Sequence, residues 1–290
     1  PTAGEFRHVY DITADPQPAP PTPDYAGKQD WYLNDHCLIE GPAGWHLVGI
    51  TERKPANPMH EFHLDHATAP SLEGPWKKQP FALSRDVEKG ENILWAPHIV
   101  KKGDTYWMFY CAGSRRSNYD FRIHAATSKD LRTWTRVKRN PMFEDFYDAR
   151  DPMVLKVGDT YYMYYTANWD TGDTNHIVSV RTSKDLLKWS RARVAFVDKG
   201  IGTWGGNTES PFVVPYGDHF YLFIGPGDDY RSTKVYRSPN PYAWDLSQEV
   251  ATIRSHAAEV VQDRQGRWHI TSCGWDADGL YLAPLAWKPE

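Results

Sequence analysis

The strongest constraint on the fold of this chain is an internal repeat in which corresponding residues lie 55 positions apart. The segment Val100–Ala112, V-K-K-G-D-T-Y-W-M-F-Y-C-A, reappears at Leu155–Ala167 as L-K-V-G-D-T-Y-Y-M-Y-Y-T-A. A second motif, T-S-K-D-L-x-x-W, ends at Trp134 and again at Trp189, which is the same spacing. Because two motifs share one offset, the chain repeats a whole structural unit and not a single turn.

Each repeat has the same order of local signals. A short apolar run is followed by a G-D turn, an alternating aromatic strand, a further strand and the S-x-D-L-x-x-W turn. Four short antiparallel strands per unit are typical of a propeller blade. Diverged copies begin near Asn34, Pro211 and His256, which brings the number of units to five. The sequence therefore predicts an all-β fold, a single five-bladed β-propeller.

The first 29 residues differ in composition from the rest. They contain the stretch A-D-P-Q-P-A-P-P-T-P, and proline cannot donate to a strand ladder. We therefore expect residues 1–29 to be a proline-rich lead-in and residues 30–290 to form one catalytic propeller domain. Within the lead-in, Phe6–Ile12 is a candidate for a strand that helps to close the ring.

Composition narrows the classes of function. The 13 Trp and 17 Tyr exceed what a core usually needs, and such rings serve strand pairing as well as stacking against sugars. A net charge of -4 without a basic stripe argues against nucleic acid as a partner. No apolar run is long enough to span a membrane. The isolated Cys37, Cys111 and Cys273 suggest neither a disulfide framework nor zinc.

In a propeller the first strand of every blade lines the central channel, so the five blade starts should meet in space. These starts are N-D-H, W-A-P-H, A-R-D-P, T-E-S-P and S-H-A-A. Three of them supply a carboxylate, namely Asp35, Asp151 and Glu209. Three acids in one pocket suit glycoside cleavage, in which one protonates the leaving oxygen, one acts as base or nucleophile and one tunes a pKa.

In these motifs the sequence resembles the five-bladed propeller glycosidases of glycoside hydrolase family 43, with the family 32 fructosidases as a related match. The resemblance covers roughly residues 30–287 and rests on W-A-P, R-D-P and E-S-P. It implies that Asp35 is the base of an inverting enzyme or the nucleophile of a retaining one. It also implies that Asp151 is the pKa modulator and Glu209 the general acid. Because N-D-H-C departs from both family patterns at the first blade, Asp30 is an alternative to Asp35.

Further residues near the blade starts are expected to bind substrate. Tryptophans would stack on sugar rings and arginines would donate charged hydrogen bonds to hydroxyl groups. His256 opens the last blade, where the resemblance implies a structural calcium ion or a water near the axis; a hydrogen-bonded core histidine is the alternative. No cofactor is expected to be required. The expected substrate-binding residues are Asn34, Trp95, His98, Arg150, Trp204, Asn207 and Arg254.

The run H-E-F-H-L-D-H at His60–His66 looks like a metal cluster, but strand alternation divides its side chains between two faces. This division disfavours a zinc site, although one of the histidines could reach the rim of the pocket and bind sugar hydroxyls.

Taken together, the three acids and the resemblance imply an inverting hydrolase of pentosyl or furanosyl bonds in plant or microbial glycans, acting on arabinofuranose, xylose, galactofuranose or fructose. The expected partner is an oligo- or polysaccharide, and the expected location is extracellular or periplasmic, with the cytoplasm as an alternative. Other hypotheses are a retaining β-fructofuranosidase, a non-catalytic glycan-binding propeller and a phosphorylase with a phosphate pocket. That last site would draw on Arg115, Arg116 and Arg150. Sugar choice is expected to lie in the rim loops 113–120 and 168–175.

Overall fold

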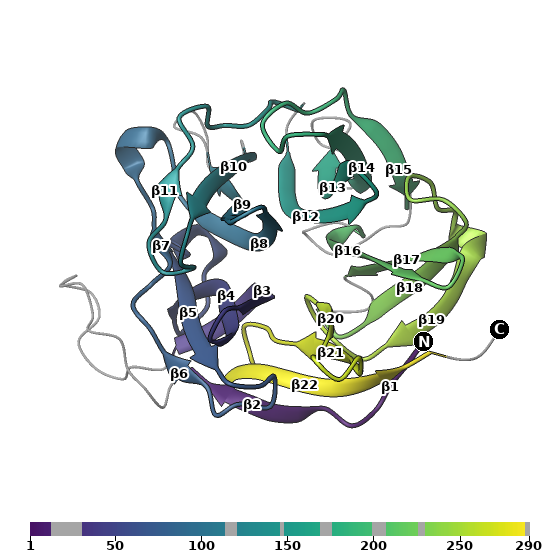
Figure 1. Cartoon of the computed structure of the whole chain (residues 1–290), viewed down its shortest axis with the longest axis horizontal. Coiled ribbons are helices and arrows are strands. Elements are labelled where there is room, and N and C mark those ends of the chain that lie inside the picture. The colour runs from purple at the N-terminus through teal and green to yellow at the C-terminus, as the bar shows by residue number, and fades with distance from the viewer. Residues whose placement is uncertain are drawn as a thin grey trace.

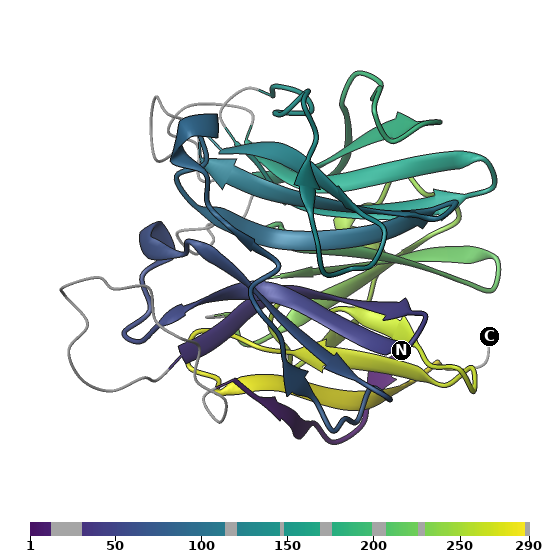
Figure 2. The same ribbon diagram turned by 60° about the vertical axis from the view of Figure 1, so that its left-hand side comes forward.

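The computed structural model of the chain describes residues 1–12, 31–113, 121–145, 148–168, 176–198, 207–225 and 230–287. Five antiparallel sheets surround a central axis, which confirms the predicted five-bladed propeller (Figure 1). The view turned by 60° shows that the sheets are inclined to one another (Figure 2). None of the helices in these ranges is long and apolar enough to cross a membrane.

The strands follow the ring in chain order, and short 3₁₀ helices lie between them in the described parts of the chain. The first blade holds β3 (Trp31–Gly41), β4 (Gly44–Arg53), β5 (His63–Ala69), β6 (Lys77–Lys78) and β7 (Leu83–Ser84). The second holds β8 (Leu94–Lys102), β9 (Thr105–Gly113), β10 (Phe121–Ser128) and β11 (Thr135–Arg136). The third holds β12 (Ala149–Val157), β13 (Thr160–Asn168), β14 (His176–Ser183) and β15 (Arg193–Val197). The fourth holds β16 (Glu209–Tyr216), β17 (His219–Gly225), β18 (Thr233–Ser238) and β19 (Glu249–Ile253). The fifth holds β20 (Val260–Gln262), β21 (Trp268–Ser272) and β22 (Gly279–Ala286), joined by β1 (Thr2–Ala3) and β2 (Arg7–Asp11). The 3₁₀ helices are η1 (Pro58–His60), η2 (Val87–Lys89) and η4 (Leu246–Gln248).

The two ends of the chain meet in the fifth blade. Strands β1 and β2 both pair antiparallel with β22, so the purple N-terminal segment runs beside the yellow C-terminal strand in Figure 1. Tyr10 of β2 is buried, and its hydroxyl donates to Asp65 of the first blade at 3.0 Å. The N-terminal strand therefore fastens the last blade to the first.

The G-D turn of the sequence repeat is a two-residue hairpin loop between the first two strands of a blade. Its glycine adopts a left-handed conformation in blades 2, 3 and 4, with φ of 60° at Gly103 and 56° at Gly158 and Gly217. Only glycine takes this conformation without a steric cost, and it suits the twist of a tight hairpin. Backbone geometry thus explains why the glycine recurs.

The second repeated motif is a turn stabilised by its aspartate. Asp130 Oδ1 accepts from the backbone N–H groups of Arg132 and Thr133, both at 2.8 Å. Asp185 accepts in the same way from Leu187 and Lys188, at 2.8 and 2.7 Å. The tryptophans that end the two motifs pack into the apolar clusters at blade interfaces, which agrees with a packing role.

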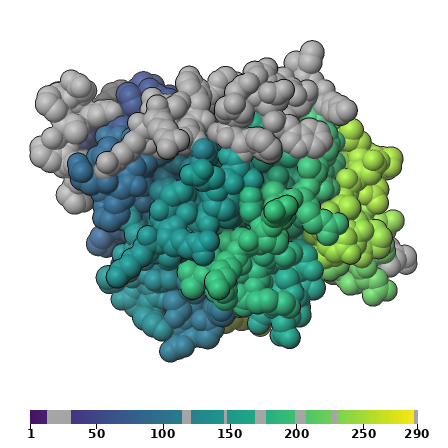
Figure 3. Space-filling model, turned by 90° about the horizontal axis from the view of Figure 1, so that it is seen from above, coloured from purple at the N-terminus to yellow at the C-terminus, as the bar shows by residue number. Residues whose placement is uncertain are grey.

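The apolar core is distributed over the interfaces between neighbouring blades. One cluster joins Leu64 of the first blade to Leu94 of the second, and another joins Phe109 of the second to Met163 of the third. All four side chains are fully buried. From above, the space-filling view shows the blue-to-green atoms of blades 2 and 3 in continuous contact with one another and with the lime atoms of blade 4 (Figure 3). Packing between blades therefore fixes where each inner strand meets the axis.

Candidate active site

A β-bulge interrupts four of the inner strands at the motif that the sequence singles out. The register shifts between Leu33 and His36, Trp95 and His98, Arg150 and Met153, and Glu209 and Phe212. One residue of the motif has a left-handed φ in four blades, namely Ala96, Asp151, Ser210 and Ala257. For a residue other than glycine this conformation costs about 1–3 kcal/mol and is concentrated at functional sites. Bulges of this kind turn side chains toward the axis.

The bulged strands surround a pocket at the centre of the ring. Asp35, Asp151 and Glu209 all line it, as the blade starts predict. The three acids do not occupy equivalent positions in their bulges. In the fourth blade Glu209 comes just before the left-handed residue Ser210, and in the third blade Asp151 is itself the left-handed residue. In the first blade Asp35 comes one residue after the corresponding position, which Asn34 occupies. A second cavity continues along the axis and shares Asp35, Asp151 and Ser210 with the first. Among the described residues, the pocket is lined by Asn34, Asp35, Ile50, Pro58, Glu61, Trp95, Arg150, Asp151, Glu209, Ser210, Tyr230, His256 and Trp275.

Ser210 connects two of the acids. Its hydroxyl donates to Asp35 Oδ1, and its backbone N–H donates to Asp151 Oδ2 at 3.0 Å. The third acid, Glu209, is paired with Arg150, whose Nη2 lies 2.9 Å from Glu209 Oε1. Arg150 is buried and also lies beside Asp148, at 3.4 Å from Nε to Oδ2. The left-handed turn at Ser210 therefore places all three carboxyl groups around one short segment.

The pocket favours protonated carboxyl groups. Burial, together with the charges of Asp151 and Asp35, raises the pKa of Glu209 to about 8 against the opposing effect of Arg150. Burial also raises the pKa of Asp151 to about 6. For Asp35 burial raises the pKa, while the hydrogen bond from Ser210 and the charge of Arg150 act in the opposite direction. Near neutral pH Glu209 thus holds a proton while Asp151 is mostly ionised, which is the division of states that acid and base catalysis needs.

The predicted substrate-binding residues divide into two groups. Asn34, Trp95 and Arg150 line the pocket together with the acids. His98 does not line it, because the bulge turns this side chain into the blade interface, where Nε2 lies 3.2 Å from the carbonyl oxygen of Val154. Arg254 lines an adjoining cavity of about 550 Å³. Asn207 is half-buried and is not part of the pocket lining, and Trp204 lies outside the described residues, as do Asp30, Arg115 and Arg116.

His256 lies in the pocket wall in a hydrogen-bonded environment. Its Nε2 is 3.1 Å from Asn34 Oδ1, and its backbone N–H donates to Ser272 at 3.0 Å. Burial lowers its pKa to about 4, so the ring is neutral at physiological pH. In the described part of the chain no group of three or more His, Cys, Asp or Glu could hold a metal ion. Calcium prefers several oxygen ligands, so an ion beside His256 would need most of its ligands from water, and the expected calcium site stays a prediction.

Three polar or aromatic pocket residues outside the blade starts escape prediction from sequence. Glu61, Tyr230 and Trp275 all line the pocket, and none of them lies at a blade start. Tyr230 and Trp275 form a tilted aromatic pair with ring centroids 5.4 Å apart. Glu61 belongs to the run His60–His66, and this carboxyl group, not a histidine, is the member of the run that reaches the pocket. The only sequence signal for Glu61 is that this run contains several polar residues to which the repeat assigns no role.

Comparison with known families agrees with this geometry. A sequence model described as "Glycosyl hydrolases family 32 N-terminal domain" matches residues 55–215, which is more than half of the chain. The chain belongs to this glycosyl hydrolase family. The propeller is also similar to a curated protein of Neosartorya fischeri called probable arabinan endo-1,5-alpha-L-arabinosidase C. The two are 28% identical over 211 residues, which is 67% of this chain and 62% of the relative. The chain thus matches about three fifths of the length of that relative.

Solved structures extend the likeness to nearly the whole propeller. A thermostable family 43 glycoside hydrolase superposes with a TM-score of 0.71 at 18% identity, covering 89% of this chain and 91% of the other. A family 32 β-fructofuranosidase of Bombyx mori gives 0.67 at 17% identity, covering 88% of this chain and 61% of the other. At these identities the likeness concerns the fold, and it confirms the family 43-like five-bladed propeller.

Proposed function

We propose that the protein is a glycoside hydrolase that cleaves pentosyl or furanosyl bonds, with α-L-arabinofuranosyl linkages as the first candidate. The observation that carries this proposal is the grouping of Asp35, Asp151 and Glu209 around the 209–210 segment, with Ser210 bridging the two aspartates. Membership of a glycosyl hydrolase family supports the reaction class. The arabinan-cleaving name of the curated relative supports the choice of sugar.

In the proposed mechanism Glu209 is the general acid. Its carboxyl group keeps its proton at neutral pH and can transfer it to the leaving oxygen as the glycosidic bond breaks. Asp35 is the base that removes a proton from the attacking water. Asp151, beside both, raises the pKa of Glu209 by its negative charge and orients the sugar. We expect inversion of the anomeric configuration.

Arg150 and the aromatic side chains complete the proposed site. Arg150 pairs with Glu209 and keeps it in place, while Trp95 presents its ring to the pocket and is anchored by a hydrogen bond from Nε1 to the carbonyl oxygen of Pro58 at 3.1 Å. Pyranose and furanose rings pack well on aromatic faces because their C–H groups are weakly polar. The proposed substrate is an oligo- or polysaccharide met outside the cytoplasm.

A panel of 4-nitrophenyl glycosides tests this proposal. The panel contains α-L-arabinofuranoside, β-D-xyloside and β-D-galactofuranoside, with sucrose and linear arabinan as further substrates. We expect hydrolysis of at least one pentosyl or furanosyl glycoside, and a loss of about 10²–10⁴-fold in kcat for Asp35→Asn. The exposed Glu40→Gln variant is the control and should keep full activity. Binding of glycans without any hydrolysis would instead favour a non-catalytic propeller.

Two other outcomes would redirect the assignment. Cleavage of sucrose with retention would favour the β-fructofuranosidase alternative. Cleavage that requires inorganic phosphate would favour a phosphorylase.

A further inference from the structure

Glu61 is a fourth carboxyl group in the pocket, and the proposed mechanism does not use it. It lies between η1 and β5, only 1% of its surface is exposed, and its side chain lines the same pocket as the three acids. The backbone of β8 holds it in place, because the N–H of Leu94 donates to the Glu61 carbonyl oxygen at 2.9 Å. A carboxyl group in such surroundings is costly to bury unless it has partners.

The two oxygens of this carboxyl group differ in their hydrogen bonds. Oε1 accepts two hydrogen bonds, from the Tyr32 hydroxyl at 2.8 Å and from Trp275 Nε1 at 3.1 Å. No described residue makes a hydrogen bond to Oε2. This oxygen also differs from the buried polar atoms that lack a partner, because it is not fully enclosed by protein atoms. Oε2 is therefore the oxygen that faces the open pocket.

The two donors come from the first and the last blade, which are neighbours where the ring closes. Tyr32 lies in β3 of the first blade, and Trp275 lies between β21 and β22 of the last. Both are fixed to Oε1, so the carboxyl group cannot rotate without breaking a buried hydrogen bond. Its free oxygen is thus held in one direction, which is the arrangement expected of a group that binds a ligand.

The protonation state suits a neutral polar ligand. Burial, together with the charges of Asp35 and Glu52, raises the pKa of Glu61 to about 8 against the effect of the hydrogen bonds from Tyr32 and Trp275. At neutral pH the group is mostly a carboxylic acid, which can donate through Oε2–H. A sugar hydroxyl both donates and accepts, so it matches this group in either protonation state.

We propose that Glu61 binds a hydroxyl group of the sugar in the catalytic pocket through Oε2, and that it is a specificity-determining residue. This inference rests on the proposed glycosidase function. It assigns to Glu61 recognition of the sugar and leaves proton transfer at the glycosidic oxygen to Glu209.

Deoxy sugars test the proposal directly. The substrates are 4-nitrophenyl α-L-arabinofuranoside and its 2-, 3- and 5-deoxy analogues, each measured with the wild type and with Glu61→Ala. For one analogue we expect the wild type to lose about 10–100-fold in kcat/KM, as is usual when a buried hydrogen bond is lost. In Glu61→Ala the same deoxy change should cost less than about threefold, because the partner of that hydroxyl is already absent. Equal losses in both proteins for every analogue would overturn the proposal.

Two variants separate binding from folding. Glu61→Gln keeps the oxygen that accepts from Tyr32 and Trp275 and replaces Oε2 with an amide donor, so it should retain the discrimination between hydroxyl and deoxy substrates. Glu40→Gln alters an exposed carboxyl group that is not part of the pocket lining, and it should match the wild type. If Glu61→Gln lost discrimination as fully as Glu61→Ala, a hydrogen bond from this position to the sugar would be contradicted.

Calorimetry keeps the inference distinct from the hydrolase proposal. Arabinotriose binding is measured in the Glu209→Gln protein with and without Glu61→Ala, so no turnover is needed. We expect Kd to rise at least about tenfold when Glu61 is removed. An unchanged Kd would refute the role of Glu61 even in an active hydrolase. If the wild-type protein binds arabinotriose but hydrolyses no glycoside, the hydrolase proposal is refuted and the role of Glu61 in binding is unaffected.

Discussion

At the scale of single residues, four carboxyl groups share one pocket and differ because their neighbours differ. Glu209 and Glu61 are buried beside other acids, and the pKa of each rises to about 8. Burial raises the pKa of Asp35, and the hydrogen bond from Ser210 acts in the opposite direction. With the pKa of Asp151 near 6, one pocket can hold a protonated Glu209 and an ionised Asp151 at neutral pH.

We expect a bell-shaped dependence of kcat/KM on pH. Activity should rise as Asp151 ionises, near pH 6, and fall as Glu209 loses its proton, near pH 8. With an activated aryl glycoside, Glu209→Gln should remove the alkaline limb and retain the acidic one. Initial rates between pH 4.5 and 9.5 measure both limbs. An alkaline limb that persists in Glu209→Gln would show that another group is the acid.

Sequence reasoning identifies the three acids but not the whole site. Asp151 and Glu209 are readable because R-D-P and E-S-P mark blade starts. Glu61 and Trp275 come from connections outside the repeat, so no register points to them. His98 occupies a blade-start motif and yet faces the blade interface, because one extra residue in the bulge changes the direction of every side chain beyond it. A repeat therefore predicts position along the strand better than direction.

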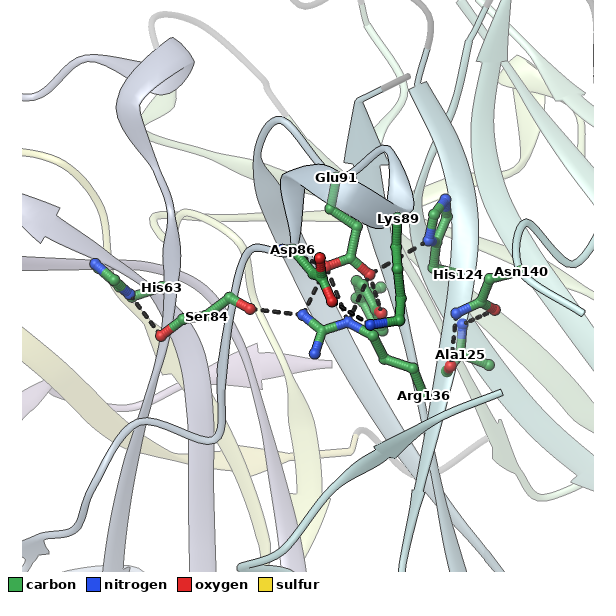
Figure 4. A network of polar contacts seen from close by, with 10 residues as sticks. His63, Ser84, Asp86, Lys89, Glu91, His124, Ala125, Arg136 and Asn140 are labelled. Atoms are coloured by element: carbon green, nitrogen blue, oxygen red, sulfur yellow. Dashed lines mark hydrogen bonds and ion pairs between the residues drawn. The ribbon is translucent and has the colours of Figure 1, made fainter. Parts of the chain in front are cut away.

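At the scale of elements, a buried polar network connects the strands of the second blade to the segment that precedes them. Glu91, just after η2, accepts from Arg136 Nη2 at 2.6 Å and from the Tyr110 hydroxyl at 2.7 Å (Figure 4). Blade 3 has a counterpart in which Arg181 Nη2 donates to Asp145 at 2.6 Å and Tyr165 donates to the same carboxylate. Tyr110 and Tyr165 are equivalent in the 55-residue repeat, whereas Arg136 comes from β11 and Arg181 from β14, so similar contacts are made from different strands.

Glu91→Gln should destabilise the protein strongly. The side chain of Glu91 is fully buried, and removing its charge leaves Arg136 without its partner, which usually costs about 3–5 kcal/mol. Urea denaturation at pH 7 measures the change. The exposed pair of Glu40 and Arg264 is the matched control, since Glu40→Gln should cost at most about 1 kcal/mol. Similar midpoints for both variants would contradict a stabilising role of the network.

Low pH should weaken the same network. Burial acts to raise the pKa of Glu91, but hydrogen bonds from His124, Arg136 and Tyr110 outweigh it and lower the pKa to about 2. A carboxyl group with a lowered pKa stabilises the folded state above its unfolded pKa, near 4.5, and this contribution is lost as the pH falls toward 2. The difference in the free energy of unfolding between the wild type and Glu91→Gln should therefore become smaller as the pH falls from 5 to 3.

At the scale of the whole molecule, the ring depends on how its ends are joined. The sequence indicates five repeats, and a strand from the first residues is the simplest way to complete the last sheet. In the structure β2 pairs with β22, while Tyr10 and Ile12 are buried against the first and fifth blades. The pairing partner of this strand could not be read from the sequence, because it lies at the opposite end of the chain and carries no repeat signature.

Removal of residues 1–12 should lower Tm by at least about 10 °C, since it exposes one edge of β22 and removes two buried apolar side chains. Differential scanning calorimetry measures the shift. Arg7→Ala, an exposed change in the same strand, is the control and should leave Tm within about 2 °C of the wild type. An unchanged Tm after truncation would mean that the ring closes without this strand.

The configuration of the first sugar released tests the central claim most directly. Proton NMR during hydrolysis of 4-nitrophenyl α-L-arabinofuranoside resolves the two anomers of free arabinose before they equilibrate. The proposed roles of Asp35 as base and Glu209 as acid predict that the β-anomer appears first, by direct attack of water. Initial appearance of the α-anomer would require a covalent intermediate and would contradict this account of the site.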